Sequence, residues 1–474
     1  MLSVLTVMSM LALEASAFWR LPCRQSLTIE RIDPLTHYGK VGEHVHTIHG
    51  GNSFSASSTE SDLLQSTCTS CAVKQDRSAY WTPVMYFKDA SGNFNIVNQT
   101  GGMLVYYLPR GDKVKSFPSG FRMIAGDPNL RSFPYPQVEK SLWQASDRTE
   151  DALRQKAVGF NCLNYAAPAN AALGLREMPD NMANNCVDGL RTEVFFPSCW
   201  NGKDVDSENH RDHMRYPSLM DDGTCPKGFE TRLVSLFFET IWNVHAFAGQ
   251  EGEFMFSTGD PTGYGYHGDF MNAWDPVFLQ SAIDVCTSPT GLVEACPLFN
   301  LQSDSEMQKC TIARTLKEDV FGPLEELPGC NLVESGPERA SPGGCSSDDT
   351  LADPDAGSGP KTTTSSRTFV KTSTGTSSAT SSKTSTATSS SATSTKSAPY
   401  GNSGSYDNNG YIHGIIDVAV AEVDDEEPVD PNVVVVTVTH YTTVPGTTVT
   451  IHTTPTAVPY AKRHTHNRRG HKNH

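Results

Sequence analysis

The distribution of cysteine constrains the fold of this chain more than any other feature. All 12 cysteines lie between Cys23 and Cys345, and none lies in the N-terminal apolar segment or in the long C-terminal region. An even number suits six bridges in an oxidising compartment. Cys68 and Cys71 have the spacing of half a zinc or redox site, but no second closely spaced pair completes it. We therefore expect six structural disulfides, whose pairing the sequence leaves open.

The N-terminus has the features of an export signal. Residues 1–17 contain an apolar run, Leu2–Leu13, followed by the small residues Ala15–Ala17, which are typical of a signal peptidase site before Phe18. The run is too short to span a bilayer, and no later segment is long enough. Asn98 begins an Asn-Gln-Thr glycosylation sequon on a predicted loop. We expect a secreted protein without a membrane span once the signal is cleaved.

Composition divides the mature chain into three parts. Residues 18–346 contain all six tryptophans and regular apolar runs, which predicts one folded unit with a substantial core. Residues 347–400 are rich in Ser and Thr and cannot bury enough apolar surface to fold, so they form either an O-glycosylated stalk or an unmodified linker. Residues 401–474 contain β-branched runs without a core, and we expect weak order there. Lys462-Arg463 resembles a dibasic processing sequence.

The formal net charge of −16 limits the partners of the chain. An acidic protein is poorly suited to bind nucleic acid or an anionic membrane surface, because both carry the same sign of charge. We therefore expect neither of these partners.

Short runs of aromatic and β-branched residues predict a mainly β fold. Such runs are bounded by Gly, Pro, Asn and Asp, as strands commonly are. They occupy residues 79–87, 102–108, 193–196 and 232–239, and helices are predicted only for residues 60–65, 138–145, 170–176 and 274–286. The predicted fold is a disulfide-braced β-sandwich, jelly-roll-like, with long loops and few short helices.

Three segments rich in histidine are candidates for a ligand or metal site. His44 and His46 alternate, so on a strand they share one face; His210 and His213 lie in a polar loop; His267 lies among glycines, with Asp269 two residues on. Imidazoles and carboxylates suit a divalent metal such as zinc, manganese or iron. Alternatively, the first pair is a hydrogen-bonded core network, and the second belongs to a surface turn.

Aromatic residues near these segments support a different hypothesis, a site that binds sugars. Trp200 and Tyr264 lie beside glycines and polar residues, which is typical of side chains that stack on sugar rings. Trp81 and Trp274 are better explained as core residues. A pair of acidic residues for glycoside hydrolysis also remains open, because the distance between carboxylates decides whether such a pair works.

Several separated motifs occur in a fixed order along the chain. They are Phe18–Cys23 (FWRLPC), Arg31–Pro34 (RIDP), His44–Gly51 (HVHTIHGG), Tyr80–Pro83 (YWTP), Cys199–Gly202 (CWNG), His210–Pro217 (HRDHMRYP) and Gly259–Phe270. Over residues 33–280 the chain resembles a family of secreted fungal proteins catalogued as domain of unknown function DUF1996. The resemblance implies a fungal, extracellular protein, and it favours a cell-wall or polysaccharide role because relatives are joined to wall-binding modules. It assigns no catalytic residue.

A cupin-like metalloprotein is the structural alternative. His44-Val45-His46 resembles the first cupin motif, but the glutamate that should follow is replaced by His49-Gly50-Gly51. Residues 261–272 resemble the second motif with intervals one residue too long.

The expected function is therefore association with extracellular or cell-wall polysaccharide through a cleft lined by His, Asp and Trp. The alternatives are a metal-assisted carbohydrate-active enzyme and a cupin-like metalloprotein, so the sequence does not decide whether the protein is catalytic.

Overall fold

The computed structural model describes residues 18–168 and 172–341, and the backbone of residues 441–444 and 447–450. The predicted signal peptide, the stalk and the dibasic pair lie outside the described residues. The structure divides into two units, residues 1–380 and 381–474. In the second unit, strands β18 (Tyr441–Val444) and β19 (Thr447–Thr450) form an antiparallel hairpin.

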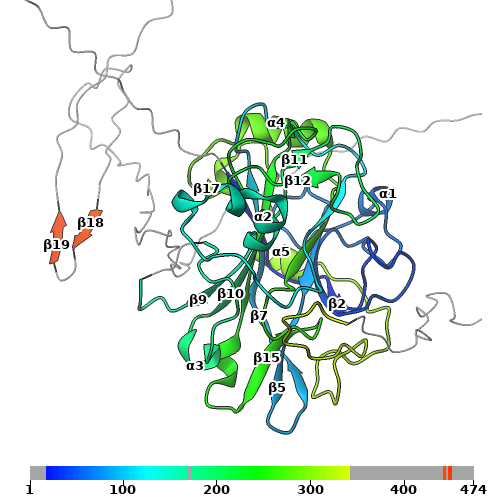
Figure 1. The fold of residues 1–474 in the computed structure, drawn as a ribbon. Helices are drawn as coiled ribbons and strands as arrows, with labels where there is room; N and C mark the ends of the chain where they lie inside the picture. Colours follow the sequence, from blue (N-terminus) through cyan, green and yellow to red (C-terminus); the bar gives the residue numbers. More distant parts are fainter. Residues whose placement is uncertain (1–17, 169–171, 342–440, 445–446, 451–474) are drawn as a thin grey trace, which may run out of the picture. The chain divides into compact units, whose positions relative to one another are not determined.

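The larger sheet of the first unit has six strands in the order β17-β1-β7-β14-β10-β9. Only the contact of β1 with β17 is parallel. The strands are β1 (Trp19–Cys23), β7 (Gln99–Leu108), β9 (Val158–Leu163), β10 (Gly189–Phe195), β14 (Ser235–Trp242) and β17 (Gly291–Leu292). Strands β9 and β10 lie side by side in Figure 1, and β14 separates β10 from β7.

A second, five-stranded antiparallel sheet has the order β2-β3-β4-β16-β8. Its strands are β2 (Thr28–Glu30), β3 (His46–Gly50), β4 (Ala79–Pro83), β8 (Arg122–Gly126) and β16 (His267–Met271). This sheet positions the candidate site, because β3 and β16 both pair with β4.

Two small three-stranded sheets and a few short helices complete the fold. One sheet contains β5 (Met85–Asp89), β6 (Phe94–Ile96) and β15 (Gly252–Phe256), and the other contains β11 (Cys199–Trp200), β12 (Met214–Arg215) and β13 (Thr231–Arg232). The α-helices are α1 (Glu60–Leu63), α2 (Glu150–Lys156), α3 (Met182–Asn185), α4 (Pro276–Val285) and α5 (Asp304–Lys309). The 3₁₀-helices are η1 (Lys140–Leu142), η2 (Ala145–Arg148), η3 (Val244–Phe247) and η4 (Val293–Ala295).

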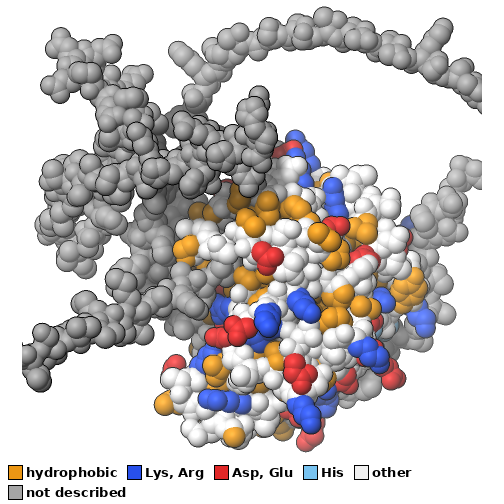
Figure 2. All heavy atoms as spheres, turned by 90° about the horizontal axis from the view of Figure 1, so that it is seen from above, with side chains coloured by type: hydrophobic (Ala, Val, Ile, Leu, Met, Phe, Trp, Pro, Cys, Tyr) orange, Lys and Arg blue, Asp and Glu red, His pale blue; other side chains and the backbone are white. Residues whose placement is uncertain are grey.

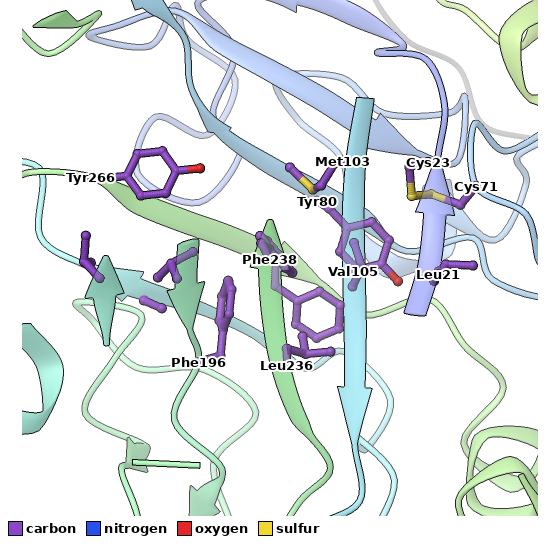
Figure 3. Packing of buried hydrophobic residues seen from close by; sticks show 14 of the residues in the cluster. Leu21, Cys23, Cys71, Tyr80, Met103, Val105, Phe196, Leu236, Phe238 and Tyr266 are labelled. Carbon is purple, nitrogen blue, oxygen red and sulfur yellow. A yellow bond between two sulfur atoms is a disulfide. The ribbon is translucent and has the colours of Figure 1, made fainter. Parts of the chain in front are cut away.

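The main core lies between the two large sheets. Tyr80 of β4 packs edge-on against Phe238 of β14, with ring centroids 5.6 Å apart, and its hydroxyl group is 2.6 Å from that of Tyr107 on β7. The hydroxyl group of Tyr266 accepts a hydrogen bond from Thr192 of β10. Figure 3 shows Tyr80 and Tyr266 among the apolar side chains of this layer. The prediction of a mainly β sandwich is therefore confirmed.

Disulfides join distant parts of the described chain. The bridges are Cys23–Cys71, Cys68–Cys310, Cys162–Cys186, Cys199–Cys225 and Cys286–Cys296. Cys330 is also disulfide-bonded, while Cys345 lies beyond the described residues. Because Cys68 and Cys71 belong to different bridges, they do not form a zinc or redox pair. The prediction of structural disulfides is confirmed for these cysteines.

The predicted helices differ from those observed in two places. Residues 138–145 form parts of the short turns η1 and η2 instead of one helix. The described part of 170–176 is not helical, because Leu175 makes backbone hydrogen bonds with Phe160 of β9. By contrast, α4 forms close to where it was predicted, since Asp275 accepts a hydrogen bond from the Phe278 amide and Pro276 occupies the first turn.

The visible surface carries charges of both signs. Basic and acidic side chains are interspersed on the face shown in Figure 2. None of the described helices is both long and apolar enough to cross a membrane.

Candidate metal centre

The order of strands in the smaller sheet brings His46 and His267 together. His46 of β3 pairs with Pro83 of β4. On the other side of β4, Asp269 of β16 pairs antiparallel with Trp81, so His267, two residues earlier, lies opposite Pro83. The two histidines therefore occupy one row across three strands. They lie on the outer face of this sheet, away from the main core, because Ile48 and Trp81 on the same face belong to a separate apolar cluster.

His44, just before β3, completes a group of three imidazoles. Its Nε2 atom is 3.1 Å from Nε2 of His267, and its ring centroid is 4.3 Å from that of His46. One ligand nitrogen from each of the three histidines lies within 4.8 Å of the other two. Imidazole nitrogens this close together can bind one ion between them, since a zinc–nitrogen bond is about 2.0–2.1 Å long.

Backbone carbonyl groups fix the tautomers of two of these rings. Nδ1 of His46 lies 3.1 Å from the carbonyl oxygen of Ile32, and Nδ1 of His267 lies 3.0 Å from that of Gly265. A carbonyl oxygen only accepts hydrogen bonds, so both Nδ1 atoms carry the proton and both Nε2 atoms present a lone pair. Metal-binding histidines are commonly oriented in this way. Nε2 of His46 is buried and has no hydrogen-bond partner among the described residues.

Burial keeps the three histidines neutral. The exposed fraction is 8% for His44, 0% for His46 and 3% for His267. Burial lowers the pKa of His267 to about 3 and that of His46 to about 4, and it lowers the pKa of His44 well below its ordinary value. Neighbouring imidazoles lower the pKa values of His44 and His267 further. The group therefore offers metal-binding lone pairs at neutral pH without first losing protons.

Asp269 adds a carboxylate to one side of the group. It is 1% exposed, and its Oδ2 atom is 3.8 Å from Nε2 of His267 without a hydrogen-bond partner among the described residues. Burial raises the pKa of this carboxyl well above its ordinary value. A buried carboxylate without donors is costly, so this oxygen requires either a proton or a cation nearby.

A polar cavity of about 240 Å³ reaches His44. Its lining includes Glu43, Asn129, Thr258 and Asn331. The hydroxyl oxygen of Thr258 is buried and has no hydrogen-bond partner within the described part of the chain. The cavity is thus an approach to the histidine group that is lined by groups able to bind hydroxyls.

His210 and His213 make other contacts instead of joining the group. Nδ1 of His210 is 2.8 Å from Oδ1 of Asp206. The two ring nitrogens of His213 are each 3.0 Å from an oxygen, the hydroxyl of Ser207 and the carbonyl of Arg122. His213 therefore has no nitrogen left for a metal, and it holds the loop against β8.

Trp200 and Tyr264, the predicted sugar-stacking residues, are both partly buried. The indole nitrogen of Trp200 donates to the carbonyl oxygen of Asp204, 2.7 Å away, which makes this ring part of its own loop. Tyr264 stacks on Phe133, with centroids 6.1 Å apart, and donates to Glu177. Tyr264 lies nearer than Trp200 to the cavity at His44, because the adjacent Gly265 packs against Pro128, which lines that cavity.

Asn98, the predicted glycosylation residue, is exposed between β6 and β7. The attachment of a glycan there is sterically open.

Sequence reasoning missed most of the residues around the group. Only Glu43, next to His44, could have been proposed from its position. Thr258 and Asn331 reach the cavity through folding of distant loops and belong to no local pattern. Asp33 was also missed; it is buried, and its charge acts on His46, His267 and Asp269.

Comparison with known protein families identifies one match. The profile of Domain of unknown function (DUF1996) matches residues 33–274, which contain all three histidines and Asp269. The chain belongs to this family. Searches of curated proteins and of solved structures gave no match. The predicted resemblance to DUF1996 is thus confirmed, and the family description assigns no activity.

Proposed function

We propose that this DUF1996 protein is an extracellular protein that holds a divalent metal ion between His44, His46 and His267. One observation carries the proposal: three buried, neutral imidazoles converge, and two of them have their Nδ1 protons committed to backbone carbonyls. A polar core network would not require the Nε2 atom of His46 to be buried without a partner. Three histidines suit zinc, iron or manganese.

Asp269 is the proposed fourth ligand. Its unpartnered Oδ2 is 3.8 Å from Nε2 of His267, and a divalent cation between these atoms would compensate the buried negative charge. The cupin-like alternative has the same types of ligand, but here the carboxylate follows the third histidine on the same strand.

The proposed ligand of the centre is a hydroxyl-rich molecule such as a cell-wall or extracellular polysaccharide. The cavity at His44 supports this proposal, since its lining supplies amide, hydroxyl and carboxylate groups from Asn129, Asn331, Thr258 and Glu43. Its volume of about 240 Å³ is below the range of about 300–1,000 Å³ for drug-sized ligands, which favours a single sugar unit at the metal.

Metal analysis of the purified secreted protein tests the metal. The protein is produced without a histidine tag and assayed for bound metal, followed by competition with a chromophoric chelator. The variant Asp269→Asn should weaken binding about 10- to 100-fold, a range taken from changes around other metal sites. Asp76→Asn is a matched control: Asp76 is also fully buried, but it accepts hydrogen bonds from Ser78 and Tyr80. A protein that binds none of the three metals would overturn the proposal.

A polysaccharide panel then separates an enzyme from a binding protein. Metal-loaded and chelated samples are incubated with wall polysaccharides, and both retention and product release are measured. Release that disappears on chelation and returns with metal identifies an enzyme. Retention without product identifies a binding protein. If neither occurs with any polysaccharide, the proposed ligand class is wrong, while the metal result still stands by itself.

A further inference from the structure

A second cavity, unrelated to the histidine group, lies between α2 and the loop that follows β12. Its volume is about 340 Å³, within the range of ligand pockets, and it shares no lining residue with the cavity at His44. The disulfide Cys199–Cys225 anchors the loop to β11, so the disulfide helps to preform the wall of the cavity.

Three cationic side chains line this cavity in an otherwise acidic protein. They are Arg148, Arg215 and Lys227, against a single carboxylate, Glu150. That carboxylate is already engaged, because it accepts a hydrogen bond from the Tyr216 amide. The same carboxylate also lies 3.6 Å from an Arg154 nitrogen. The remaining charge in the cavity is positive, which favours an anionic ligand.

Arg215 is held in a position to bind a carboxylate. Its guanidinium carbon lies 4.7 Å from the centre of the Phe229 ring, and its Nη1 atom donates to the carbonyl oxygens of Met214 and Asp212. The same Nη1 atom lies 3.4 Å from Oδ1 of the Asp212 carboxylate, which is outside the lining of the cavity. Within the described residues, all hydrogen bonds of this side chain use Nη1. The edge formed by Nε and Nη2 is thus available, and it matches the two oxygens of a carboxylate.

Apolar groups form much of the remaining wall, beside the hydroxyl-bearing residues Ser218 and Thr224. Leu153, Tyr216, Pro226 and Phe229 line the cavity, and the hydroxyl group of Tyr216 is turned away to donate to the carbonyl oxygen of Phe195. A small inorganic anion would leave this apolar surface unfilled. A ligand with an apolar body would cover it and gain hydrophobic stabilisation.

We propose that this cavity binds a small organic acid, with its carboxylate on Arg215 and its apolar body against Tyr216 and Phe229. The site is separate from the proposed metal centre and does not depend on it.

Calorimetric titration with 3-phenylpropanoate tests the proposal in the full secreted chain. The acid should bind at least tenfold more tightly than its methyl ester, because the ester cannot accept a bidentate charged hydrogen bond. Arg215→Gln should weaken binding of the acid at least tenfold and leave the ester unchanged. Arg314→Gln is the matched control, since Arg314 also lies over an aromatic ring, Phe321, but outside the cavity.

Four results would overturn the proposal. The first three are equal affinity for the acid and the ester, an unchanged affinity in Arg215→Gln, and inorganic phosphate that binds as tightly as the acid. Absence of binding at millimolar concentrations of 3-phenylpropanoate and of straight-chain carboxylates would overturn it as well. Thermal unfolding of each variant checks that the fold is intact. Affinity should be the same with and without a metal chelator, which keeps this test independent of the histidine group.

Discussion

Replacing His46 by asparagine should remove the metal-dependent part of the protein's stability. The asparagine Nδ2 atom can take the place of the histidine Nδ1 and donate to the Ile32 carbonyl oxygen, while the ligand atom Nε2 is lost. His49→Asn is the matched control. His49 lies on the same strand with 0% exposure, and its Nδ1 is 3.0 Å from the Gln25 carbonyl oxygen, but its side chain points to the other face of the sheet.

The expected size follows from binding linkage. Metal at 100 times its dissociation constant stabilises the folded protein by about 2.7 kcal/mol. If loss of one ligand weakens binding about 100-fold, the same metal concentration contributes only about 0.4 kcal/mol. With an unfolding entropy of about 2.1 cal/mol/K per residue over about 320 folded residues, the wild-type Tm should rise by about 4 °C, and that of His46→Asn by less than about 1 °C.

Differential scanning calorimetry of apo and metal-loaded protein measures both quantities. Both substitutions remove ring atoms from a buried position, so both apoproteins should lose about 2 to 4 kcal/mol. Only His46→Asn should lose the response to metal. A metal-dependent rise of the same size in His46→Asn and the wild type would refute the assignment of His46 as a ligand. So would a wild-type protein whose Tm does not respond to zinc, iron or manganese.

Three further properties can be measured on the same protein. The apoprotein should lose stability as the pH falls from about 6.5 towards 4. Burial lowers the pKa of His46 and of His49 to about 4, whereas the same side chains in the unfolded chain take up protons near pH 6.5. Urea unfolding should show a loss of roughly 2 kcal/mol per histidine between pH 7 and pH 5, and equal stability at the two pH values would contradict this reasoning. Replacing Cys68 and Cys310 by alanine should lower the free energy of unfolding by about 5 kcal/mol, because this bridge closes a loop of 242 residues; a denaturant-measured loss under about 1 kcal/mol would argue against it. Protein secreted from a eukaryotic host should carry a glycan that Asn98→Gln removes, since this side chain is exposed, and mass spectrometry showing identical masses apart from the substitution would exclude the site.

The alternative to a metal centre is a hydrogen-bonded core network. In that arrangement His44 would donate from Nε2 to Nε2 of His267, across the observed 3.1 Å, and both rings would stay neutral. The network would still leave Nε2 of His46 and Oδ2 of Asp269 without partners. A cation between the three imidazoles would give Nε2 of His46 a partner, which is why we propose a metal centre.

Much of the architecture follows from local patterns in the sequence. The twelve cysteines predicted a disulfide-braced fold, and short aromatic and β-branched runs predicted strands in the places where β4, β7, β10 and β14 form. The prediction of a single strand over residues 79–87 is wrong, because this run contributes to two sheets. Strand β4 ends at Pro83, and Met85 begins β5 in another sheet. Proline has no amide hydrogen to continue the ladder of hydrogen bonds.

The sequence by itself predicted that His44 and His46 would lie together, because alternate residues of a strand share a face. The two rings do lie together, with centroids 4.3 Å apart, although β3 begins only at His46 and His44 lies in the segment before it. Only the tertiary structure decided that His267, 223 residues from His44, joins them while His213 does not. That choice depends on β4 lying between β3 and β16, and on hydrogen bonds that occupy both nitrogens of His213. Strand order and burial arise from the packing of the whole sandwich, so no local pattern of residues reports them.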